Sequence, residues 1–193
     1  MKIQLLILLT ALTFLPLVSQ AAKPAAPTSC CAKPTSCCAD VPTDKCPTPA
    51  QFADTVATVN TLEIALGKVA QTNASLPSVK KFGLHMVESH TELQAGLVKL
   101  AAAEKITLPT KLDAKHQAIL KKLSALKGPA FDKTYIPAMV EGHTKVLAMF
   151  KNVAASCTDP AVKAYAKKNT KVIADHLKMA KKVQAEMKKA DLL

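Results

Sequence analysis

The chain has 193 residues, of which 49% are hydrophobic and 4% aromatic, and its formal net charge is +12. This hydrophobic content is enough for one buried core in a single domain, and the excess of unbranched over aromatic residues favours helices. All 26 basic residues are lysines and tryptophan is absent, so the arginine forks and aromatic platforms of nucleic-acid readers are missing or scarce. We therefore expect no nucleic-acid partner.

The first 21 residues have the pattern of an export signal. Lys2 precedes an apolar run from Ile3 to Val18, and Ser19-Gln20-Ala21 offers small residues where a signal peptidase cuts. We expect cleavage after Ala21 and a mature protein in the periplasm or outside the cell. The run is short for a bilayer span, and no later stretch is long enough for one, so we expect no transmembrane anchor.

Residues 22–48 form a separate segment rich in proline and cysteine, which we expect to be disordered. The motif Pro-Thr-Ser-Cys-Cys-Ala occurs at 27–32 and again at 34–39. This composition is unsuited to a packed core. In an oxidising compartment the cysteines predict disulfides, and the alternative is a tail that binds copper(I) or zinc through thiolates. The tail thiols concerned are Cys30, Cys31, Cys37 and Cys38.

Residues 49–193 have apolar residues at helical spacing and form the expected folded domain. The pattern predicts long helices over residues 49–73, 77–105, 131–155 and 159–189. The connection between the second and third contains a short amphipathic helix from Asp113 to Leu126, and it can run back along helices of about 37 Å. The predicted fold is therefore all-α, a ferritin-like four-helix bundle with a short extra helix in this crossover. The crossover brings Cys46 and Cys157 to one end, so we expect a disulfide between them.

Four polar residues interrupt the apolar stripes of the long helices. Glu63, His90, His143 and His176 each take an inward position near the middle of one helix, so aligned helices place them at one level. One carboxylate and three imidazoles suit a single transition metal ion such as zinc, copper or iron. The alternative is a hydrogen-bonded network without metal, in which Glu63 is ionised and one imidazole is protonated.

Other candidate groups are less specific. Met86, Met139 and Met179 each lie one turn from a core histidine and form a second candidate set for a soft metal, although methionine is also a common core residue. We expect His85 and His116 at the surface. The last helix carries nine lysines between residues 163 and 189. They form a solvated face or, as the alternative, attract anionic envelope polymers or lipid surfaces weakly.

A family resemblance is carried by stretches at residues 62–68, 79–82, 86–90, 107–109, 123–132 with Tyr135, 140–143 and 175–177. In this order they resemble a family of secreted bacterial ferritin-like domains of unknown function, often labelled predicted outer membrane proteins. The resemblance implies a ferritin-like fold and a secreted location, leaves association with the outer membrane open, and implies no established activity. The family usually has Asp directly before the histidine of the second helix. This chain has Ser89 there, which weakens any supporting role that the resemblance would give to this position.

Two functions of different classes are compatible with these features. The first is a periplasmic protein that binds or stores a transition metal. The second is a non-enzymatic structural or interaction protein of the cell envelope. An enzyme is not favoured, because we find no nucleophile arrangement, phosphate loop or organic cofactor motif. A di-iron centre is not expected either, because Val87, Val140 and Ile173 occupy the positions where such centres require Glu.

Overall fold

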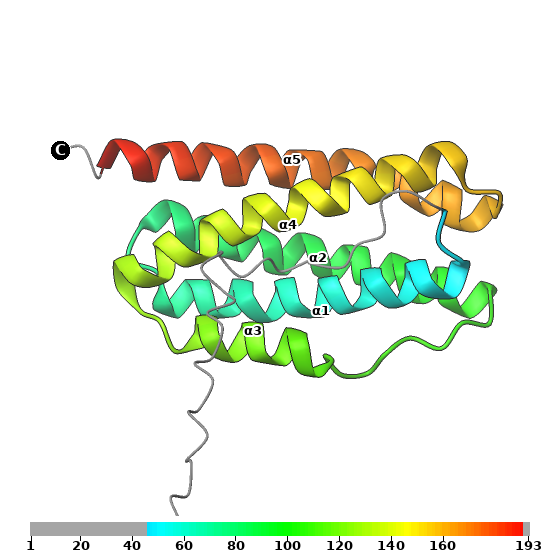
Figure 1. Cartoon of the computed structure of the whole chain (residues 1–193), viewed down its shortest axis with the longest axis horizontal. Helices are drawn as coiled ribbons and strands as arrows, with labels where there is room; N and C mark the ends of the chain where they lie inside the picture. The colour runs from blue at the N-terminus through cyan, green and yellow to red at the C-terminus, as the bar shows by residue number, and fades with distance from the viewer. Residues whose placement is uncertain (1–45, 191–193) are drawn as a thin grey trace, which may run out of the picture. The chain divides into compact units, whose positions relative to one another are not determined.

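A computed structural model describes residues 46–190 as five α-helices, without a strand in this range (Figure 1). Four are long: α1 (Pro49–Asn73), α2 (Pro77–Ala103), α4 (Gly128–Ser156) and α5 (Pro160–Ala190). The short helix α3 (Ala114–Ser124) lies between α2 and α4. The predicted all-helical class is confirmed. The predicted signal peptide and the tail thiols Cys30, Cys31, Cys37 and Cys38 lie outside the described residues.

Local sequence explains where the helices begin. A capping box starts α1: the Gln51 amide donates to Thr48 Oγ1 at 3.2 Å, and the Thr48 amide donates to Gln51 Oε1 at 2.9 Å. Asp113 caps α3, and Asp159 accepts from the Val162 amide in the first turn of α5. Proline stands in the first turn of every long helix, where its missing N–H costs no hydrogen bond.

Two ends of the long helices differ from the prediction by two residues or more, and the short helix α3 ends at Ser124 instead of Leu126. Helix α2 ends at Ala103, because Lys105 adopts a left-handed conformation (φ 54°) and the Ile106 amide turns back to the Ala101 carbonyl at 2.8 Å. Helix α4 begins at Gly128, before the predicted residue 131, since Pro129 belongs to its first turn.

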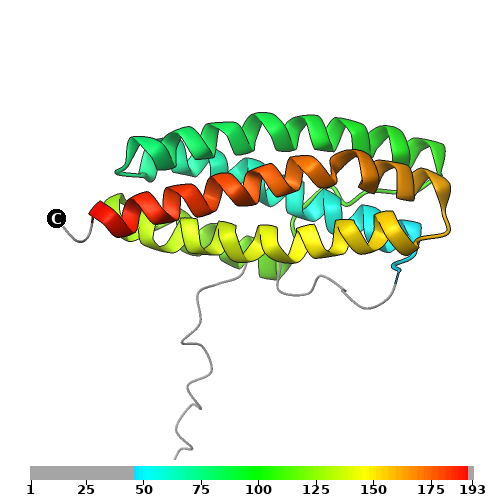
Figure 2. The same cartoon turned by 90° about the horizontal axis from the view of Figure 1, so that it is seen from above.

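The long helices pair as two hairpins, α1 with α2 and α4 with α5, and α2 also packs against α5 (Figure 2). Both hairpin connections are short, so their helices are antiparallel. The longer connection from α2 to α4 returns along α1 through α3, which makes α2 and α4 run in the same direction (Figure 1). The predicted crossover is thus present, and the middles of α2, α4 and α5 lie at one level.

One core is shared by all five helices. Its largest fully buried side chains include Phe52, Phe82 and Phe150. Helices α1 and α2 approach most closely at two glycines, where a Cβ on Gly67 would lie 2.5 Å from the Gly83 carbonyl oxygen. This close approach fixes the register of α1 against α2 one turn from the polar centre of the domain.

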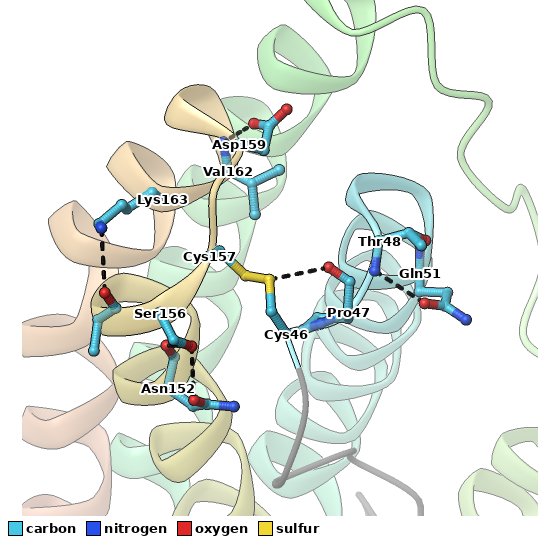
Figure 3. Close-up of a disulfide and its surroundings, with 11 residues drawn as sticks. Cys46, Pro47, Thr48, Gln51, Asn152, Ser156, Cys157, Asp159, Val162 and Lys163 are labelled. Atoms are coloured by element: carbon cyan, nitrogen blue, oxygen red, sulfur yellow. Dashed lines mark hydrogen bonds between the residues drawn. A yellow bond between two sulfur atoms is a disulfide. The ribbon is translucent and has the colours of Figure 1, made fainter.

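A disulfide joins the start of α1 to the turn between α4 and α5 (Figure 3). It links Cys46 to Cys157, the pair that the sequence analysis favoured, with Cα atoms 5.3 Å apart. At the other end of these helices, Asp132 of α4 accepts from the amides of Ser75 and Leu76 in the α1–α2 turn. The two hairpins are therefore tied together at both ends. Among residues 46–190, no helix has both the length and the apolar character needed to cross a bilayer.

Candidate metal centre

Three histidines from three helices meet in the middle of the domain. His90 of α2, His143 of α4 and His176 of α5 are exposed by only 1%, 3% and 1%. Their ring centroids are 5.1 Å apart for His90 and His176, 5.4 Å for His143 and His176, and 5.8 Å for His90 and His143. One ring nitrogen from each lies within 4.8 Å of the other two, and within residues 46–190 this is the only such cluster of metal-ligating side chains. We call these residues the three-histidine cluster.

Each imidazole is held through one of its two ring nitrogens. His90 Nδ1 lies 3.0 Å from Asn60 Oδ1, and the amide of Asn60 donates in turn to Gln94 Oε1. His143 Nδ1 lies 2.9 Å from the carbonyl oxygen of Met139. His176 Nε2 lies 2.8 Å from the Ser89 hydroxyl. These bonds orient the rings and, since a carbonyl oxygen only accepts, they place the proton of His143 on Nδ1.

The other nitrogen of each ring has no hydrogen-bond partner. These buried unpaired atoms are Nε2 of His90, Nε2 of His143 and Nδ1 of His176. An unpaired buried polar atom normally costs free energy, and natural proteins leave few of them. With the proton on the hydrogen-bonded nitrogen, each free nitrogen presents a lone pair. A histidine that ligates a metal typically has this arrangement, with its other N–H held by a carbonyl or side-chain oxygen.

Burial keeps all three rings neutral near pH 7. Desolvation lowers the pKa of His143 to about 4. Desolvation, together with repulsion from His143 and His85, lowers the pKa of His176 to about 3. The pKa of His90 is also lowered well below its ordinary value, by burial and by the other histidines. Neutral imidazole is the form that binds a metal ion, so the lone pairs are available at neutral pH.

Glu63 is as deeply buried as the histidines, at 1% exposure, but it does not belong to the three-histidine cluster. It lies on α1, one turn after Asn60. Burial raises the pKa of its carboxyl group to about 8, and Oε2 has no hydrogen-bond partner. The charged network considered from the sequence requires an ionised Glu63 and a protonated imidazole, whereas burial favours the neutral form of both. Its role as a metal ligand stays a prediction.

Three supporting residues were missed or misjudged from the sequence. Asn60 follows Val59 on the inward stripe of α1, and this second polar interruption was the available signal. Ser89 was expected to weaken any supporting role of its position, but its hydroxyl forms a hydrogen bond with His176. His85 was expected at the surface, but it is half buried and its ring lies edge-on to that of His176, with centroids 5.3 Å apart. The residue types alone give no sign of these cross-helix contacts.

The remaining candidates differ in burial and in their place in the fold. Met86 and Met139 are fully buried in the core, while Met179 is half buried and lines a surface groove. His116 lies on α3, away from the cluster, with its Nδ1 2.7 Å from the carboxylate of Asp113. The nine lysines of the last helix lie on α5, and eight of them are exposed.

These features define a class of protein: an all-helical domain with a buried histidine cluster, in which each ring has one hydrogen-bonded nitrogen and one nitrogen without a partner. The sequence match to a known family covers residues 35–183, and the chain belongs to the family described as domain of unknown function DUF4142. This confirms the resemblance to a domain family of unknown function. No curated protein and no solved structure matches the chain.

Proposed function

We propose that this protein is an exported, ferritin-like four-helix bundle that binds one divalent transition metal ion through His90, His143 and His176. The observation that carries the proposal is the set of three buried, unpaired ring nitrogens. A hydrogen-bonded network would leave these atoms bonded to one another or to neighbouring groups. Convergent lone pairs from neutral imidazoles are instead the donor set of zinc, copper(II) and iron(II) sites.

The geometry is compatible with a metal ion after a small adjustment. A tetrahedral ion with metal–nitrogen distances of about 2.0–2.1 Å needs nitrogens about 3.3 Å apart. The ligand nitrogens of the cluster lie within 4.8 Å of one another. Each ring therefore moves by less than about 1 Å toward the centre, which side-chain rotation supplies. Three protein ligands leave a fourth position for water or for Glu63, whose carboxyl group has to lose its proton to bind.

The test is metal content and binding on full-length protein without an affinity tag. The tail thiols are replaced by serine so that they do not contribute; these are Cys30, Cys31, Cys37 and Cys38. After chelator treatment and dialysis against Zn²⁺, Cu²⁺ or Fe²⁺, mass spectrometry of the elements should give one equivalent of at least one metal. The His143→Ala variant should lose it. The matched control is His116→Ala, which removes a histidine that is bonded to Asp113 on α3.

Two results would end the proposal. One is the absence of stoichiometric metal in a folded protein, as judged by circular dichroism. The other is retention of the metal in a folded His143→Ala variant. Export is tested separately by cell fractionation and by N-terminal sequencing, which should begin at Ala22. Association with the outer membrane, or with anionic envelope components through the lysines of α5, would appear in the same fractionation as salt-sensitive binding.

A further inference from the structure

A groove lies between α2 and α5, and one of its lining residues, His85, lies against His176 of the three-histidine cluster. It has a volume of about 390 Å³, and its lining includes His85, Met179, Phe82, Lys81, Lys182 and Glu186. Helices α2 and α5 lie side by side along this seam (Figure 2). The three-histidine cluster is at most 3% exposed, so an ion has to enter past partly exposed side chains. This groove is the place where an additional histidine stands between solvent and the cluster.

His85 has the position and the chemistry of an intermediate ligand. It is half buried in the groove wall, and its ring centroid lies 5.3 Å from that of His176. That separation equals the spacing within the cluster, where centroids are 5.1 to 5.8 Å apart. Within residues 46–190, neither ring nitrogen of His85 has a hydrogen bond.

The charge of the groove does not draw in a cation. Lys81 and Lys182 line it against one carboxylate, Glu186. A divalent ion is therefore not attracted electrostatically into this groove. Its entry depends on a ligand that replaces the water molecules that the ion loses. Among the lining residues, His85 offers the imidazole nitrogen that suits a borderline transition metal, and Met179 offers only a weaker thioether.

We infer that His85 is the entry ligand of the metal centre: it takes a divalent transition metal ion from the α2–α5 groove and passes it to His176. This rests on the proposed function of the three-histidine cluster. The step is a ligand exchange, in which the ion loses a water and gains His85, then loses His85 as it gains the cluster. No electron is transferred in this exchange.

An entry ligand and a permanent ligand have different kinetic consequences. An entry ligand lowers the barrier in both directions, so its removal slows loading and release by the same factor and leaves the equilibrium constant unchanged. Removal of a permanent ligand weakens binding and accelerates release. Removal of a side chain that merely blocks the groove accelerates both.

The experiment follows Zn²⁺ loading by stopped flow, with a chromophoric chelator as donor, and release to excess EDTA. The protein is the full chain with the four tail cysteines replaced by serine. We expect His85→Ala to slow both rates by about tenfold at unchanged stoichiometry and affinity. Ser78→Ala changes the lining of the same groove without removing a ligand and is the matched control.

Each other outcome is informative. Unchanged or faster loading in His85→Ala overturns the inference, as does a loss of affinity with faster release. Equal slowing in Ser78→Ala overturns it too, because the effect would then belong to the groove and not to the imidazole. Absence of Zn²⁺ binding in the parent protein, with Cu²⁺ and Fe²⁺ also absent, refutes the proposed function itself and is seen before any variant is made.

Discussion

The buried carboxyl group of Glu63 should make the stability of the metal-free domain fall as the pH rises. Burial raises its pKa from 4.5 to about 8. The folded state therefore holds this proton more tightly than the unfolded state, and the stability it contributes is complete below pH 4.5 and is lost as the pH rises through 8. This rise in the pKa corresponds to a loss of stability of about 5 kcal/mol above pH 8 and of about 3 kcal/mol at pH 7.

The three histidines should make the stability of the domain fall as the pH decreases below about 6.5. Their folded-state pKa values lie below 6.5, with His143 at about 4 and His176 at about 3, so unfolding takes up protons once the pH falls below 6.5. At pH 5 each of these two rings costs about 2 kcal/mol of stability. The domain should therefore be most stable between about pH 6 and 7, with a decline on both sides.

The perturbation that separates the two effects is Glu63→Gln. It removes the alkaline decline and leaves the acid decline, so its stability relative to the parent protein should increase by about 3 kcal/mol between pH 4.5 and pH 7. The assay is urea unfolding followed by circular dichroism at 222 nm, in EDTA, at intervals from pH 4.5 to 9. Glu88→Gln removes the same charge from an exposed position of α2 and serves as the control.

The refuting result is a difference between Glu63→Gln and the parent that does not change with pH. A constant offset would mean that glutamine merely packs better or worse at this site. A difference that grows toward acid pH would mean that Glu63 is ionised in the folded protein, as in the charged network with a protonated imidazole. The reasoning about neutral rings in the cluster would then be wrong as well.

Four further predictions concern the helical frame that positions the cluster. Gly67→Ala should destabilise the domain by about 1–3 kcal/mol in urea unfolding, because its Cβ would lie 2.5 Å from the Gly83 carbonyl oxygen. Gly96→Ala, where the nearest atom is 3.4 Å away, should instead stabilise it by up to about 1 kcal/mol. Cys157→Ser removes the disulfide that closes a loop of 111 residues and should lower the free energy of unfolding by about 4–5 kcal/mol. The stability of this variant is compared with that of the parent protein under reducing conditions. Lys105→Gly relieves the left-handed conformation at the end of α2 (φ 54°) and should raise the stability by about 1 kcal/mol, which a higher Tm would show; an unchanged Tm would contradict this.

Most of the helical frame could be predicted from local sequence. Thr48-Pro49, Asp113 and Asp159-Pro160 mark helix starts by short-range capping, which needs no knowledge of the fold. The apolar spacing around His90, His143 and His176 places each of them on the buried face of its own helix. A connection between α2 and α4 that is long enough to return along the domain then brings the three histidines to the same height along the helix axes. Their convergence was therefore predictable, since it depends on periodicity and chain length.

Which groups touch the rings was decided only by the tertiary structure. Asn60, Ser89 and the Met139 carbonyl select which nitrogen of each imidazole is held and which is left as a lone pair. These contacts depend on how far each helix is rotated about its axis and how it is shifted along its neighbour. Rotations and shifts of about 1 Å decide them, and the periodicity of the sequence does not define positions so finely. The same rotation leaves Glu63 outside the cluster and turns His85 from the predicted surface toward His176. The sequence by itself determined that polar groups would meet in the core, because their spacing along each helix is local. The packing of α1, α2, α4 and α5 decided the hydrogen bonds and the protonation of these groups, because burial and distance are properties of the whole fold.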